Sequence, residues 1–479
     1  MLCTPGFWED AYQALKEDAL SGATTARRVL LFVAKGNCDA IATLQILEHV
    51  LNKDNVPYGI YPVANEAELV QRSEEMLRDD EERSIICIGC GASIDIRTTL
   101  SCSPGVRIYV FDSHRPLDRM NCEKTNSQVL IVCEDGDHVI AEEESDSDED
   151  VPSSSSDDDE EDADEEDGGA GGGSGKRRRR NEEKGKALKK AKKAPPRDHA
   201  LLASGCLAYE FASHLNKSDV GCLWKCIVSL TEHYLCQRVT HDDYMQRVVE
   251  YERKIAMMGA ANTAVSSNSN SSLGRKRIQY REDFHLLLLQ HWSLADALFN
   301  SPYVATRLRT WKESGREKLE LMLAKMGFPL VECHQHFTHM SPKLKQRLST
   351  KLQECAPQFG LVNCAFASFE KEDGLTSTDM VHAVNALLVQ EGGFWGAYEA
   401  LSSGKKKDGA VQKGIELAKG LQRVIVKVGG EVIGRNGMVV NCGSFRYAAL
   451  GDTLQEEALS NPFILERLPP FIQEGPLRG

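Results

Sequence analysis

Val29-Leu30-Leu31-Phe32-Val33-Ala34 is a continuous run of β-prone apolar residues near the start of this 479-residue chain. Such runs are typical of strands that are buried on both faces of a parallel sheet. Lys35-Gly36-Asn37-Cys38 follows as a polar loop, and residues 39–51 then carry apolar side chains at helical spacing. The segment predicts a strand, a loop and a helix, which is the repeating unit of α/β folds.

Three further apolar runs have the same character and predict strands at residues 84–88, 106–111 and 128–132. In an open parallel sheet, polar residues just beyond the carboxyl ends of the strands converge in one crevice. We therefore expect one cleft to contain the residues that follow these strands. They are Asn37, Asp39, Gly89, Cys90, Asp112 and His114.

The composition is that of a globular protein with several domains, since hydrophobic residues make up 41% of the chain and charged residues 27%. No apolar run approaches the roughly 18 residues that would cross a membrane, and residues 1–20 mix acidic and basic residues with apolar ones, unlike a secretory signal. The 15 cysteines are scattered along the chain, which favours reduced thiols inside a cell over a disulfide framework.

The net charge of -14 comes mainly from one segment. Residues 142–167 contain 17 acidic residues and no basic ones, and residues 176–193 contain 11 basic residues and two acidic ones. Without these two segments the charge is -6, so the isoelectric point says little about nucleic-acid binding by the folded part. Segments of this composition cannot bury enough apolar surface to fold, which predicts a disordered insertion.

The pattern of apolar residues changes along the chain and predicts five parts. After residue 198 it is mainly helical, with predicted helices that include residues 283–300, whereas residues 414–427 have the pattern of a helix passing into a strand and residues 439–449 are β-like. The five parts are an α/β domain at 1–140, the insertion at 141–197, a helical region at 198–300 with a polar loop at 262–276, an inserted helical domain at 301–400, and a partial α/β domain at 401–479.

Several quoted segments together resemble the eukaryotic cell division control protein 45 family, a degenerate relative of the RecJ nucleases in the DHH superfamily. They are residues 29–34 with Cys38-Asp39-Ala40, residues 90–95, Phe111-Asp112-Ser113-His114-Arg115-Pro116, Leu289-Gln290-His291-Trp292-Ser293-Leu294, residues 301–311, and Leu323-Ala324-Lys325-Met326-Gly327-Phe328-Pro329-Leu330. A match in order, spacing and aromatic content over about 40 residues is far more specific than a short motif.

The resemblance implies an α/β fold with a DHH-type, RecJ-like parallel-sheet domain, a mainly helical middle region and a partial DHHA1-like domain at the C-terminus. The family's C-terminal domain should continue for several strands beyond Gly479, so we expect it to be incomplete here. DHH phosphoesterases bind two manganese ions with acidic and histidine side chains from several strands. This chain has Asn37, Gly89 and Ser113 at three of those positions, which leaves Asp39, Asp112 and His114 and predicts a degenerate cleft without catalytic activity, metal or other cofactor.

The family resemblance further implies a non-catalytic subunit of the replicative helicase. The implied partners are the MCM helicase hexamer, the GINS complex, DNA polymerase and other replication factors, chromatin origins and single-stranded DNA. Lys35 and Arg115 are the candidate contacts with DNA phosphates. The alternative is an active manganese-dependent DHH-type single-strand exonuclease or phosphodiesterase, and a third class is an acidic histone or nucleic-acid chaperone.

The basic part of the insertion has the two-cluster form of a nuclear import signal, which predicts a nuclear protein. Its residues are Lys176, Arg177, Arg178, Arg179, Arg180, Lys189, Lys190, Lys192 and Lys193. A counter-charge for the acidic segment, or a loose contact with nucleic acid, is the alternative. Ser145 and Ser147 lie among acidic residues and suit an acid-directed kinase.

Three smaller patterns have plain structural explanations. Cys87 and Cys90, like Cys222 and Cys226, are expected to be core thiols. Cys333-His334-Gln335-His336 with His339 is a possible metal cluster, although a solvated helix face explains it better. Trp224, Trp292, Tyr303 and Trp311 suit helix packing, while the basic residues around Trp311 form a candidate surface for single strands or partners; these are Arg307, Arg309, Lys312, Arg316 and Lys318.

Overall fold

The computed structural model describes most of the chain outside the charged insertion. The described residues are 1–20, 28–77, 84–123, 125–134, 202–265, 278–362, 364–403, 405, 407–435, 439–442, 445–448, 450 and 462–474. The chain divides into two units, Met1–Ile140 with Ala200–Gly479, and Ala141–His199. The second unit lies outside the described residues, and so do the predicted import signal, Ser145 and Ser147.

A six-stranded sheet forms the centre of the N-terminal part, and every pairing in it is parallel. The strand order is β1-β6-β5-β4-β2-β3. The strands are β1 (Leu2–Cys3), β2 (Val29–Ala34), β3 (Tyr58–Val63), β4 (Ile85–Ile88), β5 (Ile108–Phe111) and β6 (Val129–Val132). The predicted α/β fold is confirmed, and the structure adds two strands that the apolar runs did not indicate, β1 and β3.

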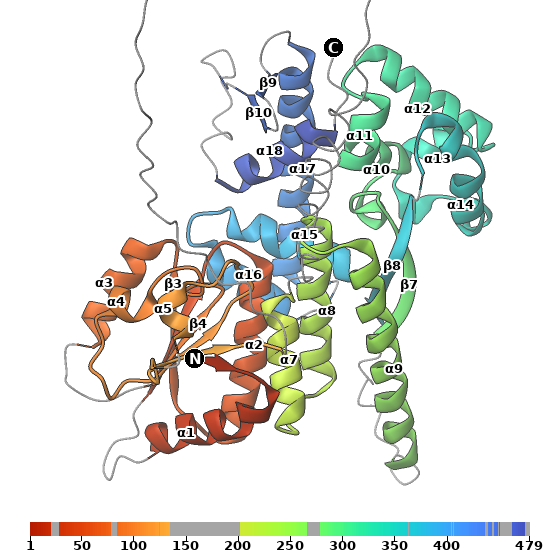
Figure 1. The fold of residues 1–479 in the computed structure, drawn as a ribbon. Helices are drawn as coiled ribbons and strands as arrows, with labels where there is room; N and C mark the ends of the chain where they lie inside the picture. The colour runs from red at the N-terminus through yellow and green to blue at the C-terminus, as the bar shows by residue number, and fades with distance from the viewer. Residues whose placement is uncertain are drawn as a thin grey trace, which may run out of the picture. The chain divides into compact units, whose positions relative to one another are not determined.

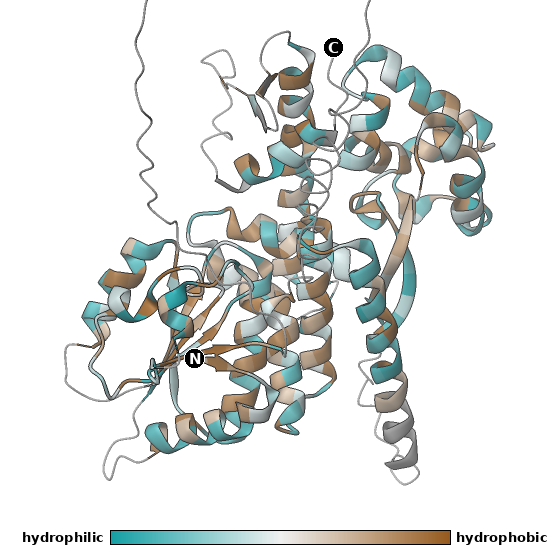
Figure 2. Ribbon diagram, viewed as in Figure 1, coloured by the Kyte–Doolittle hydropathy of each residue, from teal (hydrophilic) through white to brown (hydrophobic). Residues whose placement is uncertain are grey.

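Strands β2, β4, β5 and β6 are buried on both faces, which explains why they are apolar throughout. Along β2, Val29, Leu31 and Val33 belong to the larger core, whereas Leu30 and Phe32 belong to a second core on the other face. Strand residues alternate between faces, so one apolar run supplies both cores. Figure 2 shows mainly hydrophobic colours along the strands of this sheet, while many helices carry both hydrophobic and hydrophilic residues.

Helix α2 connects the sheet to the helices that follow the insertion, because it packs against both α7 and α8 (Figure 1). The helices of this part are α1 (Trp8–Leu20), α2 (Cys38–Lys53), α3 (Glu66–Met76), α4 (Ile96–Leu100), α5 (Arg119–Cys122), α7 (Ser204–His214), α8 (Val220–Leu235) and α9 (His241–Val265), with a short 3-10 helix, η1, at Pro5–Phe7. The predicted helix at residues 39–51 is confirmed.

The described residues after α9 are mainly helical and include two antiparallel strand pairs, β7 with β8 and β9 with β10. The strands are β7 (Ile278–Phe284), β8 (Ala365–Lys371), β9 (Val439–Cys442) and β10 (Phe445–Ala448). The helices are α10 (Leu294–Asn300), α11 (Pro302–Leu308), α12 (Glu313–Lys325), α13 (Leu330–His334), α14 (Pro342–Cys355), α15 (Ser377–Leu388), α16 (Gly393–Ser403), α17 (Gly409–Gly434) and α18 (Pro462–Glu474). Short 3-10 helices are η3 (Leu289–His291), η4 (Phe337–His339) and η5 (Ala356–Phe359).

Two predictions for this region were wrong. The span 283–300 is not one helix, since it begins with the last residues of β7, which pair with β8 some 80 residues later in the chain. The span 414–427 does not end in a strand, because α17 continues to Gly434. In both places contacts with distant segments override the local pattern, as they commonly do. The β-like prediction for 439–449 is confirmed by β9 and β10.

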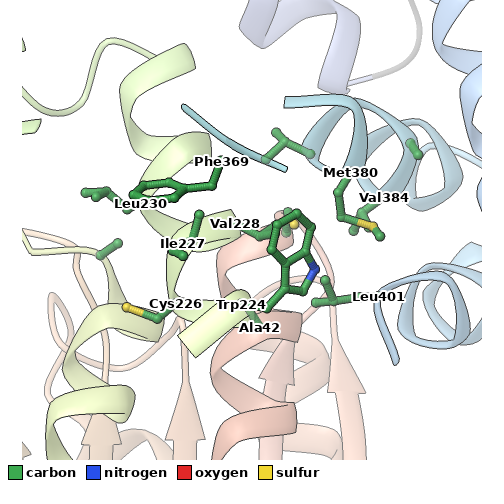
Figure 3. Packing of buried hydrophobic residues seen from close by; sticks show 14 of the residues in the cluster. Ala42, Trp224, Cys226, Ile227, Val228, Leu230, Phe369, Met380, Val384 and Leu401 are labelled. Atoms are coloured by element: carbon green, nitrogen blue, oxygen red, sulfur yellow. The ribbon is translucent and has the colours of Figure 1, made fainter. Parts of the chain in front are cut away.

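One large hydrophobic cluster contains side chains from the N-terminal α/β part and from the helices that follow residue 200. Figure 3 shows Trp224 of α8 among side chains from α2, α15 and α16, with Ala42, Met380, Val384 and Leu401 nearby. Trp224 is 2% exposed, as its predicted packing role requires. Among the described residues, no helix is both long enough and apolar enough to cross a membrane.

Gly414 marks a close crossing of α17 and α15, and we expect Gly414→Ala to destabilise the fold by about 1–3 kcal/mol. A Cβ there would stand 2.5 Å from the backbone oxygen of Ala383, which cannot move without shifting α15. The matched control is Gly420→Ala on the same helix, where a Cβ meets nothing within 4 Å. It should raise stability by roughly 0.5–1 kcal/mol. Urea unfolding compares the two, and equal effects would contradict the crossing argument.

Candidate functional site

The structure places the predicted cleft residues just after the carboxyl ends of β2, β4 and β5, which are neighbours in the sheet. The strand order reverses beside β2, since β3 lies on one side of it and β4 on the other. Such a reversal is where ligands of open α/β sheets normally bind. Asn37 is the N-cap of α2, and its side-chain oxygen accepts a hydrogen bond from the Ala40 N–H at 2.8 Å.

Asp39 is buried, and protein groups occupy both of its carboxylate oxygens. Oδ1 accepts hydrogen bonds from the Gly205 N–H at 2.8 Å and the Ser229 hydroxyl at 2.5 Å. Oδ2 accepts from the Ser204 N–H at 3.0 Å and lies 3.3 Å from His233 Nε2. Asp39 is 1% exposed and His233 is 2% exposed. Asp39 therefore binds α2 to the start of α7 and to α8.

A second buried carboxylate, Glu232 of α8, covers the N-terminus of α2. It accepts hydrogen bonds from the Cys38 N–H at 3.2 Å and the Asp39 N–H at 2.5 Å. Asn385 of α15 accepts a hydrogen bond from the Cys38 N–H on its Oδ1 at 3.1 Å. Its Nδ2 donates to Glu232, also at 3.1 Å. A carboxylate at this position satisfies free N–H groups and interacts favourably with the helix dipole.

The two carboxylates differ in their acidity. Burial alone raises the pKa of Asp39, but hydrogen bonding and charge from His233, together with the donors Ser229 and Gly205, outweigh it and hold that pKa below its ordinary value. Burial, and the neighbouring charge of Asp39, raise the pKa of Glu232. Both groups are less than 3% exposed, so solvent and substrates do not reach them.

Asp112 and His114 form a pair at the end of β5 that is separate from the Asp39 contacts. Asp112 Oδ1 accepts from the His114 backbone N–H at 3.1 Å and lies 2.6 Å from His114 Nδ1, while Oδ2 accepts from the Ala92 N–H at 3.1 Å. Asp112 is buried, whereas the His114 side chain is 52% exposed. The hydrogen bond to Asp112 raises the pKa of His114, and burial offsets only part of that rise.

Gly89 stands at the end of β4 with a positive φ of 66°. A Cβ at this position would lie 3.1 Å from the Cβ of Ala40 and 3.4 Å from that of Ala34. The backbone conformation and the lack of space both disfavour any side chain there. An acidic residue could not be placed at 89 without moving the start of α2.

The candidate phosphate contacts, Lys35 and Arg115, already have protein partners. Lys35 Nζ donates to both carboxylate oxygens of Glu68, at 2.8 and 3.0 Å. Arg115 donates from one guanidinium nitrogen to the backbone oxygens of Asp112 and His114, at 3.0 and 2.9 Å. Arg115 therefore helps to hold the loop after β5. A phosphate that binds Lys35 would compete with the Glu68 carboxylate for its ammonium group.

These residues do not fit a two-manganese centre. Such a centre needs several carboxylate and imidazole groups with free electron pairs directed at two ions. The oxygens of Asp39 face four protein groups, Asn37 caps a helix, and Gly89 has no side chain. No metal-dependent step is assigned to this site.

The residues that complete the site come from far along the chain and were not predicted. Ser204, Ser229, Glu232 and His233 lie on α7 and α8, and Asn385 lies on α15. One signal for them exists in the sequence, since Glu232 and His233 continue the apolar face of α8, where charged groups require buried partners. Their partners could not be identified without the tertiary structure.

The structure also places the cysteine pairs, the Cys333–His339 cluster and the basic residues near Trp311. Cys87, Cys222 and Cys226 are buried free thiols, as predicted, and Cys90 is partly exposed. Cys333 is buried, while the rings of His336 and His339 lie 5.8 Å apart. Two of the basic residues near Trp311 pack on aromatic rings, since Arg307 lies 3.9 Å from the Tyr303 ring centre and Arg316 lies 5.1 Å from that of Phe299.

A separate cavity of about 350 Å³ lies between α8, α15, α17 and α18. Its lining includes His285, His382, Tyr303 and Arg467. Burial lowers the pKa of His285 to about 4 and that of His382 to about 3, so both rings are neutral at physiological pH. None of the predicted cleft residues lines this cavity.

Asp39→Ala should destabilise the fold by about 3–5 kcal/mol, because it leaves four buried groups without their shared acceptor. The control is Asp118→Ala, which removes the N-cap of the short helix α5 and should cost about 1 kcal/mol. Urea unfolding of both variants measures the difference. A loss at Asp39 no greater than at Asp118 would contradict the proposed structural role of its carboxylate.

The pKa of His114 should lie above its usual value of about 6.5, and Asp112→Asn should lower it. Protonated His114 pairs with Asp112, so this pair stabilises the fold below the unfolded-state pKa and loses its contribution as pH rises through the raised value. Titration of the imidazole C–H signals by NMR measures the change. The same pKa in the wild type and in Asp112→Asn would contradict the pairing.

Comparison with known proteins agrees with this architecture. The family model described as CDC45 matches residues 29–201, 200–393 and 389–475. The cell division control protein 45 homologue of Schizosaccharomyces pombe is 34% identical over 425 residues, which cover 80% of this chain and 65% of the relative. The Dictyostelium discoideum homologue is 29% identical, covering 99% and 86%, and the human one is 27% identical, covering 89% and 77%.

The crystal structure of CDC45 from Entamoeba histolytica has the same fold, with a TM-score of 0.69 and 20% sequence identity, over 99% of this chain and 83% of that one. The chain spans about two thirds of the length of the S. pombe relative. Since the family model matches nearly the whole chain after residue 29, this chain belongs to the CDC45 family.

Proposed function

We propose that this chain acts in the initiation of DNA replication and in fork progression, as a non-catalytic subunit of the replicative helicase. Membership of the CDC45 family supports the proposal, as do relatives named cell division control protein 45 in fungi, a slime mould and mammals. The chain contains no G-x-x-x-x-G-K-[ST] motif for nucleotide phosphates, so ATP hydrolysis would belong to a partner.

One observation carries the non-catalytic part of the proposal. The Asp39 carboxylate, at the position where the DHH resemblance expects a metal ligand, is 1% exposed and faces four protein donors. A group used in this way cannot also bind an ion or activate water. We therefore assign to this edge of the sheet a structural role that evolved from a catalytic arrangement.

The proposed partners are the MCM helicase hexamer and the GINS complex, with DNA polymerase, other replication factors and origin chromatin as further contacts. The N-terminal α/β domain and the helical domain at 301–400 would pack against the ring and GINS. Exposed apolar side chains on this helical domain support such a contact, since Val331 is 84% exposed and Leu321 is 51% exposed. Residues 401–479 would form part of a DHHA1-like domain.

Nuclear localisation and contact with single-stranded DNA complete the proposal. The two basic clusters at 176–180 and 189–193 support import, because basic runs of this kind are typical of nuclear import signals. Arg115 and Lys35 are the proposed phosphate contacts, with Lys35 exchanging part of its pairing with Glu68 for a phosphate oxygen. Such binding should weaken steeply with salt.

Affinity capture from a nuclear extract tests the partner proposal. Tagged wild-type chain should capture MCM and GINS subunits, identified by mass spectrometry, and so should a variant that lacks residues 142–167. Val331→Asp should reduce capture, because it places a charge on an exposed apolar surface, whereas the control Val249→Asp on α9 should not. Failure of the wild type to capture either complex would overturn the proposal, and loss of capture after deletion of 142–167 would favour the chaperone class.

A nuclease assay separates the proposal from the exonuclease alternative. Purified chain with manganese and labelled single-stranded oligonucleotides should release no nucleotides. Release by the wild type that is abolished in Asp112→Ala would establish the alternative. Release that persists in Asp112→Ala would identify a contaminating nuclease, so the assay has to be repeated after further purification until one of the first two results is obtained.

A further inference from the structure

Three side chains with metal-binding atoms meet at the end of α2 that is farther from the strand-end site. His49 belongs to the last turns of α2, Asp219 is the N-cap of α8, and Cys222 lies in the first turn of α8. The His49 imidazole nitrogen, the Asp219 carboxylate oxygen and the Cys222 sulfur all lie within 4.8 Å of one another. Among the described residues, this is the one group of three or more His, Cys, Asp or Glu side chains with that geometry.

The backbone around this group is held in place by other contacts. Lys217 forms an ion pair with Asp54, just after α2, and Lys53 Nζ donates to the Lys217 backbone oxygen at 2.9 Å. Asp219 Oδ1 accepts from the Cys222 N–H at 2.7 Å. That contact orients the carboxylate and leaves Oδ2 directed toward His49, 3.9 Å from its Nε2.

His49 Nε2 is the observation that points to a ligand. The atom is buried and has no hydrogen-bond partner, because 3.9 Å to Asp219 is too long for a hydrogen bond. A buried polar atom without a partner is unfavourable, and in native proteins it commonly marks a missing water or ion. The neighbouring sulfur and carboxylate oxygen make an ion the better explanation, since both are metal ligands.

We propose that His49, Asp219 and Cys222 bind one zinc ion, with a water molecule as the fourth ligand. Nitrogen, oxygen and sulfur donors in a set of four are typical of zinc. A thiolate, a carboxylate and a neutral imidazole balance the charge of Zn²⁺, and the proton of the Cys222 thiol leaves to solvent as the metal–sulfur bond forms. Asp219 is half exposed, so solvent reaches the fourth position.

The present spacing requires only a small adjustment. Zinc bonds of about 2.0–2.3 Å place tetrahedral ligand atoms roughly 3.3–3.7 Å apart, so the group has to contract by about an ångström. His49 and Asp219 can move, because their side chains are 28% and 50% exposed, whereas Cys222 is fixed within α8. The bound ion would join α2 to α8 at one end, as Asp39 and Glu232 join them at the other.

Cobalt titration of the reduced, metal-free full chain tests the proposal. Wild-type protein should bind one Co²⁺ with the near-ultraviolet thiolate-to-cobalt band and the visible bands of a tetrahedral site, and Zn²⁺ should abolish both. Cys222→Ser should remove the thiolate band, and His49→Gln should weaken binding more than about 100-fold, which exceeds the usual effect of losing an outer contact. Cys236→Ser, at the opposite end of α8, should bind as the wild type does.

Thermal unfolding gives a second readout that does not depend on spectra. Zinc should raise the melting temperature of the wild type and of Cys236→Ser but not of His49→Gln, whose partly exposed side chain can be changed without loss of the fold. Circular dichroism confirms that each variant is folded. Absence of a thiolate band in the wild type, or a band undiminished in Cys222→Ser, would overturn the proposal.

Discussion

The buried carboxylates at the N-terminus of α2 are the constraint on which the arrangement of the chain depends. Removing a carboxylate from water costs several kcal/mol unless donors surround it, so Asp39 and Glu232 are stable only where α2, α7, α8 and α15 meet. Residues 39, 204, 232 and 385 lie far apart in the chain, yet these contacts require them to be neighbours. The large hydrophobic cluster that contains Trp224 also includes Cys38 and Ala40, the neighbours of Asp39 in the chain.

The same contacts explain how polar residues at the edge of an α/β sheet can serve the fold. Polar residues stand at the positions where an open sheet normally binds ligands, and their electron pairs accept hydrogen bonds from the protein itself. Asp39 joins helices, Asn37 caps α2, and Asp112 orders the loop that contains His114. A buried network of this kind stabilises the fold, which is consistent with the proposed non-catalytic role.

Much of the α/β part could be predicted from the sequence, because its signals are local. The apolar run at 29–34 and the helix after it appear as predicted, and the strands at 84–88, 106–111 and 128–132 differ from the structure only at their first residues. Predictions were wrong where a distant partner determines the structure. The β-branched residues 424–426 remain helical because α17 packs along α15 and α18, and β7 exists only because it pairs with β8.

The sequence by itself determined the layered α/β architecture, the family, and the identity of the polar residues at the strand ends, because strand periodicity and motif order are properties of neighbouring residues. Only the tertiary structure decided what those residues do. Whether a carboxylate binds an ion or accepts hydrogen bonds from neighbouring helices depends on the groups that surround it. The groups around Asp39 belong to residues more than 160 positions away in the chain. The grouping of His49 with Asp219 and Cys222 has the same origin, since α2 and α8 become neighbours only when the chain folds.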